Sequence, residues 1–153
     1  MDYEFLIRDL HAKQSHKAIG TDKGLAKIGD GIVNLAYSIA KSIFLTKNND
    51  KNKVSRTGLK VSKKILANAL KNANMKDFAK TRADAHDLAD TVEALIAYVW
   101  LNNQISLNEI IDHLSSNLSG NLMIRSEEIQ TATDAFTKLL IKINELLPQT
   151  KKK

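Results

Sequence analysis

The chain has 153 residues, 43% of them hydrophobic, with six glycines, one proline and no cysteine. This length fits a single domain. The scarcity of glycine and proline favours helices over a sheet-rich fold. The lack of cysteine excludes disulfide bonds and thiolate metal sites. The net charge of +6 is concentrated in residues 41–80, which hold eleven Lys or Arg and two acids. This pattern is typical of a surface that faces a polyanion, or of a solvated lysine-rich exterior.

The N-terminal residues 2–18 show the spacing of a short amphipathic helix. Its apolar side chains are expected to face inward: Phe5, Leu6, Leu10 and Ile7. This helix is predicted to end near Gly20, and Thr21 or Asp22 is then suited to cap the helix that follows.

Residues 25–45 form the most informative segment, because their apolar side chains fall into two stripes. A helix that is apolar on nearly every side belongs in the middle of a fold. A single polar line runs between the stripes at steps of three and four; its members are Lys27, Asp30, Asn34, Ser38 and Lys41. We therefore expect Asp30 to be a carboxylate on an otherwise buried helix.

The rest of the chain is also predicted to be helical, without convincing strand alternation. The expected elements are a polar loop over 46–56, a basic helix over 57–74, a weak connector over 72–80, a second central helix over 83–101, a helix over 106–118 that Ser106 and Glu109 cap, a turn at 119–121 and a last helix over 126–147. The prediction is an all-α bundle forming one domain over residues 1–153.

The N-terminal sequence carries no apolar leader. The longest apolar run, residues 94–101, is too short to span a membrane. We therefore expect a cytoplasmic protein without a membrane segment.

Both central helices carry carboxylates among apolar residues. Asp90 and Glu93 lie at positions i and i+3, so they project from the same helical turn. Desolvating a carboxylate costs on the order of several kcal/mol, and the nearby polar positions offer only Lys27 as a counter-charge. One Mg²⁺ ion, which prefers oxygen ligands, would offset the charges of Asp30, Asp90 and Glu93 if the two helices face each other.

Other interpretations of these acids stay open. Asp30 could form only local hydrogen bonds, and Asp90 and Glu93 could be acids that favour the first turn of a helix. The dipeptide His86-Asp87 suggests a His-Asp phosphohydrolase, but the other histidines do not show a convincing arrangement of further ligands.

Two segments resemble the signature motifs of the ribonuclease III family. Residues 25–33 read LAKIGDGIV and residues 89–96 read ADTVEALI; they occur in the family's order, about sixty residues apart. The similarity covers roughly residues 20–118 and is strongest with the small, single-domain members of the family.

The resemblance implies an all-helical endonuclease domain that forms a homodimer and cuts double-stranded RNA, leaving 5′-phosphate and 3′-hydroxyl ends, with ribosomal RNA precursors as one substrate. By the same resemblance, Asp30, Asp90 and Glu93 take the catalytic and metal-binding positions, with Mg²⁺ as the cofactor and Mn²⁺ as a second ion that the site could use.

The sequence departs from the family pattern at Ala26, where the family usually has a fourth metal-site glutamate. Asp22 could replace that glutamate only if the chain bends between Asp22 and Asp30. Asp50 falls where larger relatives have an accessory carboxylate. Minimal bacterial relatives also lack the glutamate and still cleave RNA, so the departure bears on metal affinity and turnover.

Nothing after Leu118 resembles a double-stranded RNA-binding domain, so RNA affinity is expected to come from the basic residues of this domain. The candidates are Lys51, Lys53, Arg56, Lys60, Lys63 and Lys64. The main alternative is a non-catalytic RNA-binding or ribosome-associated protein that keeps the fold, followed by a plain helical interaction module. Part of the apolar run Leu95–Leu101 is expected at the dimer interface.

Overall fold

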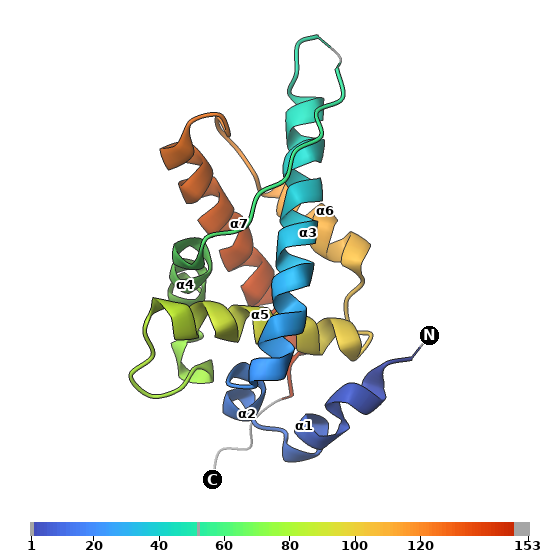
Figure 1. Ribbon diagram of the computed structural model, residues 1–153, viewed down its shortest axis with the longest axis vertical. Helices are drawn as coiled ribbons and strands as arrows, with labels where there is room; N and C mark the ends of the chain where they lie inside the picture. Colours follow the sequence, from blue (N-terminus) through green and yellow to red (C-terminus); the bar gives the residue numbers. More distant parts are fainter. Residues whose placement is uncertain (1, 52, 149–153) are drawn as a thin grey trace.

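The computed structural model describes residues 2–51 and 53–148. These residues form seven α-helices, two 3₁₀ turns and no strand (Figure 1). In chain order the elements are η1 (Glu4–Ile7), α1 (Arg8–Lys13), α2 (His16–Gly20), α3 (Lys23–Lys47), α4 (Lys63–Asn72), η2 (Lys76–Phe78), α5 (Ala85–Leu101), α6 (Leu107–Ser116) and α7 (Arg125–Leu146). The all-helical fold class is confirmed.

The core is organised around α5, whose residues from Leu88 to Val99 are buried except for the half-buried Asp90. The long helix α3 crosses α5 and also packs on α6, while α4 packs on both α5 and α7 (Figure 1). The apolar run Leu95–Leu101 lies in this core, and only Trp100 is partly exposed. The prediction that this run reaches a dimer interface is therefore wrong, because α3, α4 and α7 pack against α5 within one chain.

Helix α3 is buried on one face only, which corrects the expectation that it is enclosed on nearly every side. Ala36, Tyr37 and Ala40 are fully buried, whereas Leu35 is 50% exposed. By length and composition alone α3 could cross a membrane, which was not predicted. The core helix of a folded domain meets the same criterion, and the packing of α3 on α5 and α6 leads us to interpret it as such a helix.

The N-terminal part differs from the single helix predicted over residues 2–18. It consists of three short pieces, because Gln14 adopts a left-handed conformation with φ of 48° and Ser15 caps a new helix through its bond from the Ala18 N–H. Phe5 and Leu6, expected inside, are 61% and 50% exposed. Ile7 and Leu10 are buried in the core, as expected.

Local capping explains where the central helices begin. The Asp22 side chain accepts a hydrogen bond from the Leu25 N–H at 2.8 Å and starts α3, one of the two caps anticipated. Ser106 and Glu109 form the expected reciprocal cap of α6. The basic helix begins at Lys63, six residues later than predicted, because residues 53–61 are held against α3 as described below.

Candidate active site

Helices α3 and α5 are in close backbone contact at Gly29. A Cβ atom at this position would lie 1.8 Å from the backbone carbonyl oxygen of Glu93, so only glycine fits. Because Asp30 follows Gly29 directly, the same close approach brings Asp30 to Glu93. The Gly-Asp pair of the first motif thus has a physical reason: one residue permits the crossing and the next carries the carboxylate.

The three candidate carboxylates line one open pocket of about 300 Å³ at this crossing. Asp30 comes from α3, whereas Asp90 and Glu93 come from α5. The rest of the lining is one alanine and four lysines: Lys23, Ala26, Lys27, Lys60 and Lys63. The structure therefore surrounds the acids with four ammonium groups, where the sequence pattern indicated only Lys27.

Glu93 is the buried member of the three acids, with 4% of its surface exposed. Burial, followed by a hydrogen bond to Asp30 and the negative charge of Asp30, raises the pKa of Glu93 to about 8, although Lys63 acts in the opposite direction. This raised pKa favours the protonated form of Glu93 near neutral pH. Asp30 itself is exposed and accepts a bond from Asn34 Nδ2 at 3.3 Å, so the expectation of a buried Asp30 is wrong.

Asp90 is turned toward lysines. Its two carboxylate oxygens lie 3.5 Å from Lys23 Nζ and 3.9 Å from Lys63 Nζ. The side chain of Asp90 is 25% exposed, so these ion pairs are only partly screened by solvent. The acids therefore have different surroundings: Glu93 is buried beside Asp30, whereas Asp90 lies between two ammonium groups.

The donor set fits a hard divalent cation, because Mg²⁺ and Mn²⁺ take carboxylate oxygens and keep several waters. Within residues 2–51 and 53–148, no three acidic or histidine side chains stand close enough together to enclose a metal ion. Asp30 and Glu93 are the pair that could hold the ion, with water and phosphate completing its coordination. Asp90 would join them by leaving its lysines.

The secondary acid candidates do not reach this pocket. The Asp22 side chain is occupied as the cap of α3 and lines a smaller neighbouring pocket that also contains Asp87 and Asp90. Asp50 follows the far end of α3 and is exposed. His86 is exposed, and Asp87 closes the cap of α5, so the His-Asp phosphohydrolase interpretation gains no support.

Residues 53–61 run back along α3 as an extended segment (Figure 1). Alternate backbone N–H groups of this segment donate to polar side chains four residues apart on α3, at 2.8–3.1 Å. Two residues of extended chain rise about 6.6 Å and four residues of helix about 6 Å, so the two repeats match. We call this set the polar ladder; its pairs are Asn34 with Val61, Ser38 with Leu59, Ser42 with Thr57, and Thr46 with Ser55.

The polar ladder fixes where the basic candidates lie. Arg56 and Lys60 are exposed on the extended segment, and Lys60 reaches the acidic pocket. Lys63 lines the same pocket from the start of α4, whereas Lys64 is exposed beside it. The remaining two, Lys51 and Lys53, lie in the loop beyond the far end of α3 and do not line the pocket.

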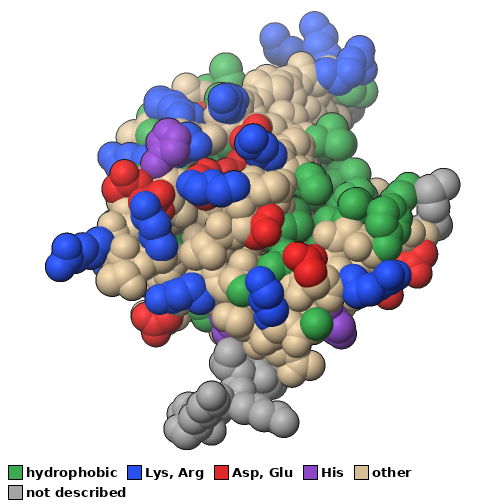
Figure 2. Space-filling view, turned by 60° about the horizontal axis from the view of Figure 1, so that its bottom comes forward, with side chains coloured by type: hydrophobic (Ala, Val, Ile, Leu, Met, Phe, Trp, Pro, Cys, Tyr) green, Lys and Arg blue, Asp and Glu red, His purple; other side chains and the backbone are tan. Residues whose placement is uncertain are grey.

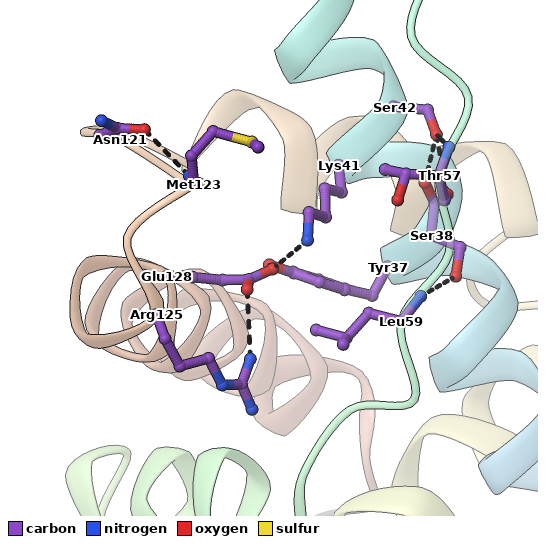
Figure 3. A network of polar contacts seen from close by, with 10 residues as sticks. All are labelled: Tyr37, Ser38, Lys41, Ser42, Thr57, Leu59, Asn121, Met123, Arg125 and Glu128. Carbon is purple, nitrogen blue, oxygen red and sulfur yellow. Dashed lines mark hydrogen bonds and ion pairs between the residues drawn. The ribbon is translucent and has the colours of Figure 1, made fainter.

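A second buried glutamate, Glu128 of α7, was not singled out from the sequence. Its carboxylate oxygens lie 2.7 Å from Lys41 Nζ and 3.1 Å from an Arg125 guanidinium nitrogen, and accept the Tyr37 hydroxyl at 3.0 Å (Figure 3). Burial alone would raise the pKa of Glu128, but the bonds from Lys41 and Tyr37 outweigh it and lower that pKa. This network joins α3 to α7.

The sequence did contain signals for both features. Asn34, Ser38 and Lys41 belong to the polar line noted on the predicted helix, but polar residues on a helix more often face solvent. Their partners are backbone N–H groups and a glutamate 87 residues away from Lys41. Periodicity along one helix cannot indicate such partners.

An all-helical domain whose two central helices meet at a pocket of carboxylates, with lysines around it, has the features of a metal-dependent nuclease. The family model described as Ribonuclease III matches residues 23–149, which include every helix from α3 to α7. The chain belongs to the ribonuclease III family, a family of nucleases. No curated protein matches the chain.

Proposed function

We propose that this protein is an endoribonuclease that cleaves double-stranded RNA with the help of Mg²⁺ or Mn²⁺. The observation that carries the proposal is the pocket at the crossing of α3 and α5, where Asp30, Asp90 and Glu93 converge among lysines. Membership of the ribonuclease III family gives this acidic pocket a chemical role. A cytoplasmic location and a part in ribosomal RNA processing belong to the same proposal.

In this proposal Asp30 and Glu93 hold the divalent ion, and Asp90 joins them directly or through water. When bound, the ion lowers the pKa of a water molecule and offsets negative charge on the scissile phosphate. Glu93 must lose its proton to act as a ligand, which Lys63 favours. Water attacks phosphorus in line with the departing 3′-oxygen, so the products carry 5′-phosphate and 3′-hydroxyl ends.

The test is cleavage of a long RNA duplex in Mg²⁺ and in EDTA. Wild type is expected to cut only in Mg²⁺, and Asp30→Asn and Glu93→Gln are each expected to abolish cutting while binding the duplex almost as wild type does. The reason is that these substitutions remove metal ligands and leave the groups that bind phosphate in place. Loss of binding in parallel with activity would contradict the assignment of both residues.

The exposed basic residues would bind the RNA backbone. Arg56 and Lys60 lie on the extended segment that is hydrogen-bonded to α3 and leads to the pocket. Duplex RNA is recognised mainly through phosphates and shape. Replacing Lys60, Lys63 and Lys64 together with alanine should weaken binding to all duplex sequences alike. The slope of log affinity against log salt should fall by somewhat less than one unit for each phosphate that the variant no longer neutralises; an unchanged slope would show a merely solvated surface.

A homodimer would provide one site for each RNA strand. Ile28, Leu35 and Ile39 are 39%, 50% and 37% exposed and follow one face of α3. Figure 2 shows a group of hydrophobic side chains toward the right of the view, whereas charged side chains are densest toward the left. Such an apolar stripe is typical of a surface that another chain covers, and it replaces residues 95–101 as the candidate interface.

Light scattering tests the dimer. Leu35→Lys should convert a dimer to a monomer and reduce double-strand cuts, whereas Ile141→Lys, at an equally exposed position on α7, should leave the dimer intact. A wild-type monomer that still cuts both strands would contradict the dimer.

The second candidate function is binding of double-stranded RNA without cleavage. Two observations favour it: the pocket wall carries Ala26, which offers no ligand atom, and Asp90 already has two lysine partners. The same assay separates the two functions, because a non-catalytic protein would bind the duplex and leave it intact in Mg²⁺ and in Mn²⁺.

A further inference from the structure

The pocket that holds the carboxylates is positively charged. Four lysines and three carboxyl groups line it, so it keeps an excess positive charge even when every carboxyl group is ionised. A site built only to collect divalent cations would be expected to carry the opposite sign. The lysines therefore need an explanation beyond neutralising the acids.

Among the lysines that line the pocket, Lys63 comes from α4. It is the first residue of α4, and the Ser62 side chain caps this helix by accepting a hydrogen bond from the Ile65 N–H. Helix α4 packs on α5, the helix that carries Asp90 and Glu93. The Lys63 ammonium lies 3.9 Å from Asp90 and its side chain is 42% exposed, so it is anchored at the acids and open to an entering ligand.

Lys23 approaches Asp90 from the other side, at 3.5 Å, but its side chain is 74% exposed. A second divalent ion at Asp90 would have to displace both ammonium groups and would be repelled by them. An anion that enters beside Lys23 and Lys63 would be attracted by both ammonium groups. The arrangement therefore favours one divalent ion at Asp30 and Glu93, and a phosphate group beside the lysines.

We propose that Lys63, with Lys23 as a weaker second contact, binds a non-bridging oxygen of the phosphate that is cut, so that beside Asp90 an ammonium group takes the place that a second divalent ion could occupy. This inference rests on the proposed function. In the step, the bond from the attacking water to phosphorus forms and the bond to the 3′-oxygen breaks. The water loses a proton to solvent, the 3′-oxygen gains one from solvent, and Lys63 keeps its own.

The test compares Lys63→Met and Lys63→Arg with Lys71→Met, a control at an exposed lysine of the same helix that does not line the pocket. Single-turnover cleavage of duplex RNA is measured at saturating protein. Lys63→Met should slow cleavage by about a hundredfold, the usual loss when one donor to a developing charge is removed. Lys63→Arg should recover most of that loss, and Lys71→Met should cut at the wild-type rate.

A second measurement does not depend on cleavage. Electron paramagnetic resonance counts the Mn²⁺ bound per protomer without RNA, with one ion expected in wild type and in Lys63→Met, and none in Asp30→Asn. Two ions in wild type would overturn the inference, and so would equal cleavage rates for Lys63→Met and Lys71→Met. If wild type itself failed to cut, the proposed function would fall together with this inference, whereas a normal rate for Lys63→Met would remove the inference alone.

Discussion

Two glutamates of this protein are equally buried and have opposite surroundings. Glu93 and Glu128 are each 4% exposed. Glu128 accepts from Lys41, Tyr37 and Arg125, and its pKa is lowered. Glu93 faces another carboxyl group, and its pKa is raised to about 8.

The difference indicates that Glu128 stabilises the fold, whereas Glu93 is suited to bind a cation. The charge of Glu128 is neutralised by groups that α3 and α7 supply, so the folded protein stabilises its ionised form. Glu93 lacks such donors, and ionising it in the folded protein is unfavourable until a cation arrives. Carboxyl groups whose pKa is strongly raised, as that of Glu93 is, are found most often at functional sites.

The largest effect is expected from breaking the Glu128 network. Glu128→Ala would leave the Lys41 ammonium buried without a partner, a change that typically costs about 3–5 kcal/mol. Urea denaturation should therefore show a large loss of stability. Glu128→Gln, which keeps the shape and one acceptor oxygen, should lose less. A loss below about 1 kcal/mol for both variants would show that the network contributes little.

Much of this fold could be predicted from the sequence, but not every partner in it. The helices of the core and the caps by Asp22 and Ser106 follow from local patterns. The convergence of Asp30 with Glu93 depends on a motif and on the size of Gly29. Contacts between distant segments could not be predicted, since no local pattern links Lys41 to Glu128.

The exposed face of α3 is another feature that a local sequence pattern could not predict. Ile28, Leu35 and Ile39 have the spacing of a core stripe, and from sequence alone a core stripe and an interface stripe look alike. The apolar run 95–101 was expected at an interface because it is apolar on all sides. Such a pattern predicts burial, but it does not distinguish burial inside one chain from burial against a second chain.

The pH dependence of stability should have opposite signs at the two glutamates. The pKa of Glu93 in the folded protein is above its unfolded value, so its contribution is fully present below about pH 4.5 and is lost as the pH rises toward 8. The pKa of Glu128 is lowered, so its contribution is present above about pH 4.5 and is lost in more acidic solution.

Melting temperatures in EDTA from pH 3 to 9 check this prediction. The advantage of wild type over Glu93→Gln should shrink between pH 5 and 8, and its advantage over Glu128→Gln should shrink below pH 4.5. Curves that stay parallel for all three proteins would mean that neither glutamate has a shifted pKa.

The smallest effect concerns the polar ladder, whose bonds involve no charge. Ser38→Ala removes the acceptor of the Leu59 N–H, which is partly buried, and should cost about 0.5–1.5 kcal/mol. Ser116→Ala, at an exposed position of α6, serves as the control and should be neutral. Urea denaturation measures both; a Ser38→Ala protein as stable as the control would mean that water replaces the ladder without cost.

The contrast between the two glutamates is tested most directly by thermal melts of wild type, Glu93→Gln and Glu128→Gln at pH 8.5, in EDTA and in Mg²⁺. At this pH Glu93 is largely ionised beside Asp30, so in EDTA Glu93→Gln should melt above wild type and Glu128→Gln below it. Mg²⁺ should raise the melting temperature of wild type and of Glu128→Gln, because it binds the folded site, and should leave Glu93→Gln unchanged. If Glu93→Gln melts below wild type in EDTA and Mg²⁺ shifts neither protein, Glu93 is a structural residue and the account of the active site is wrong.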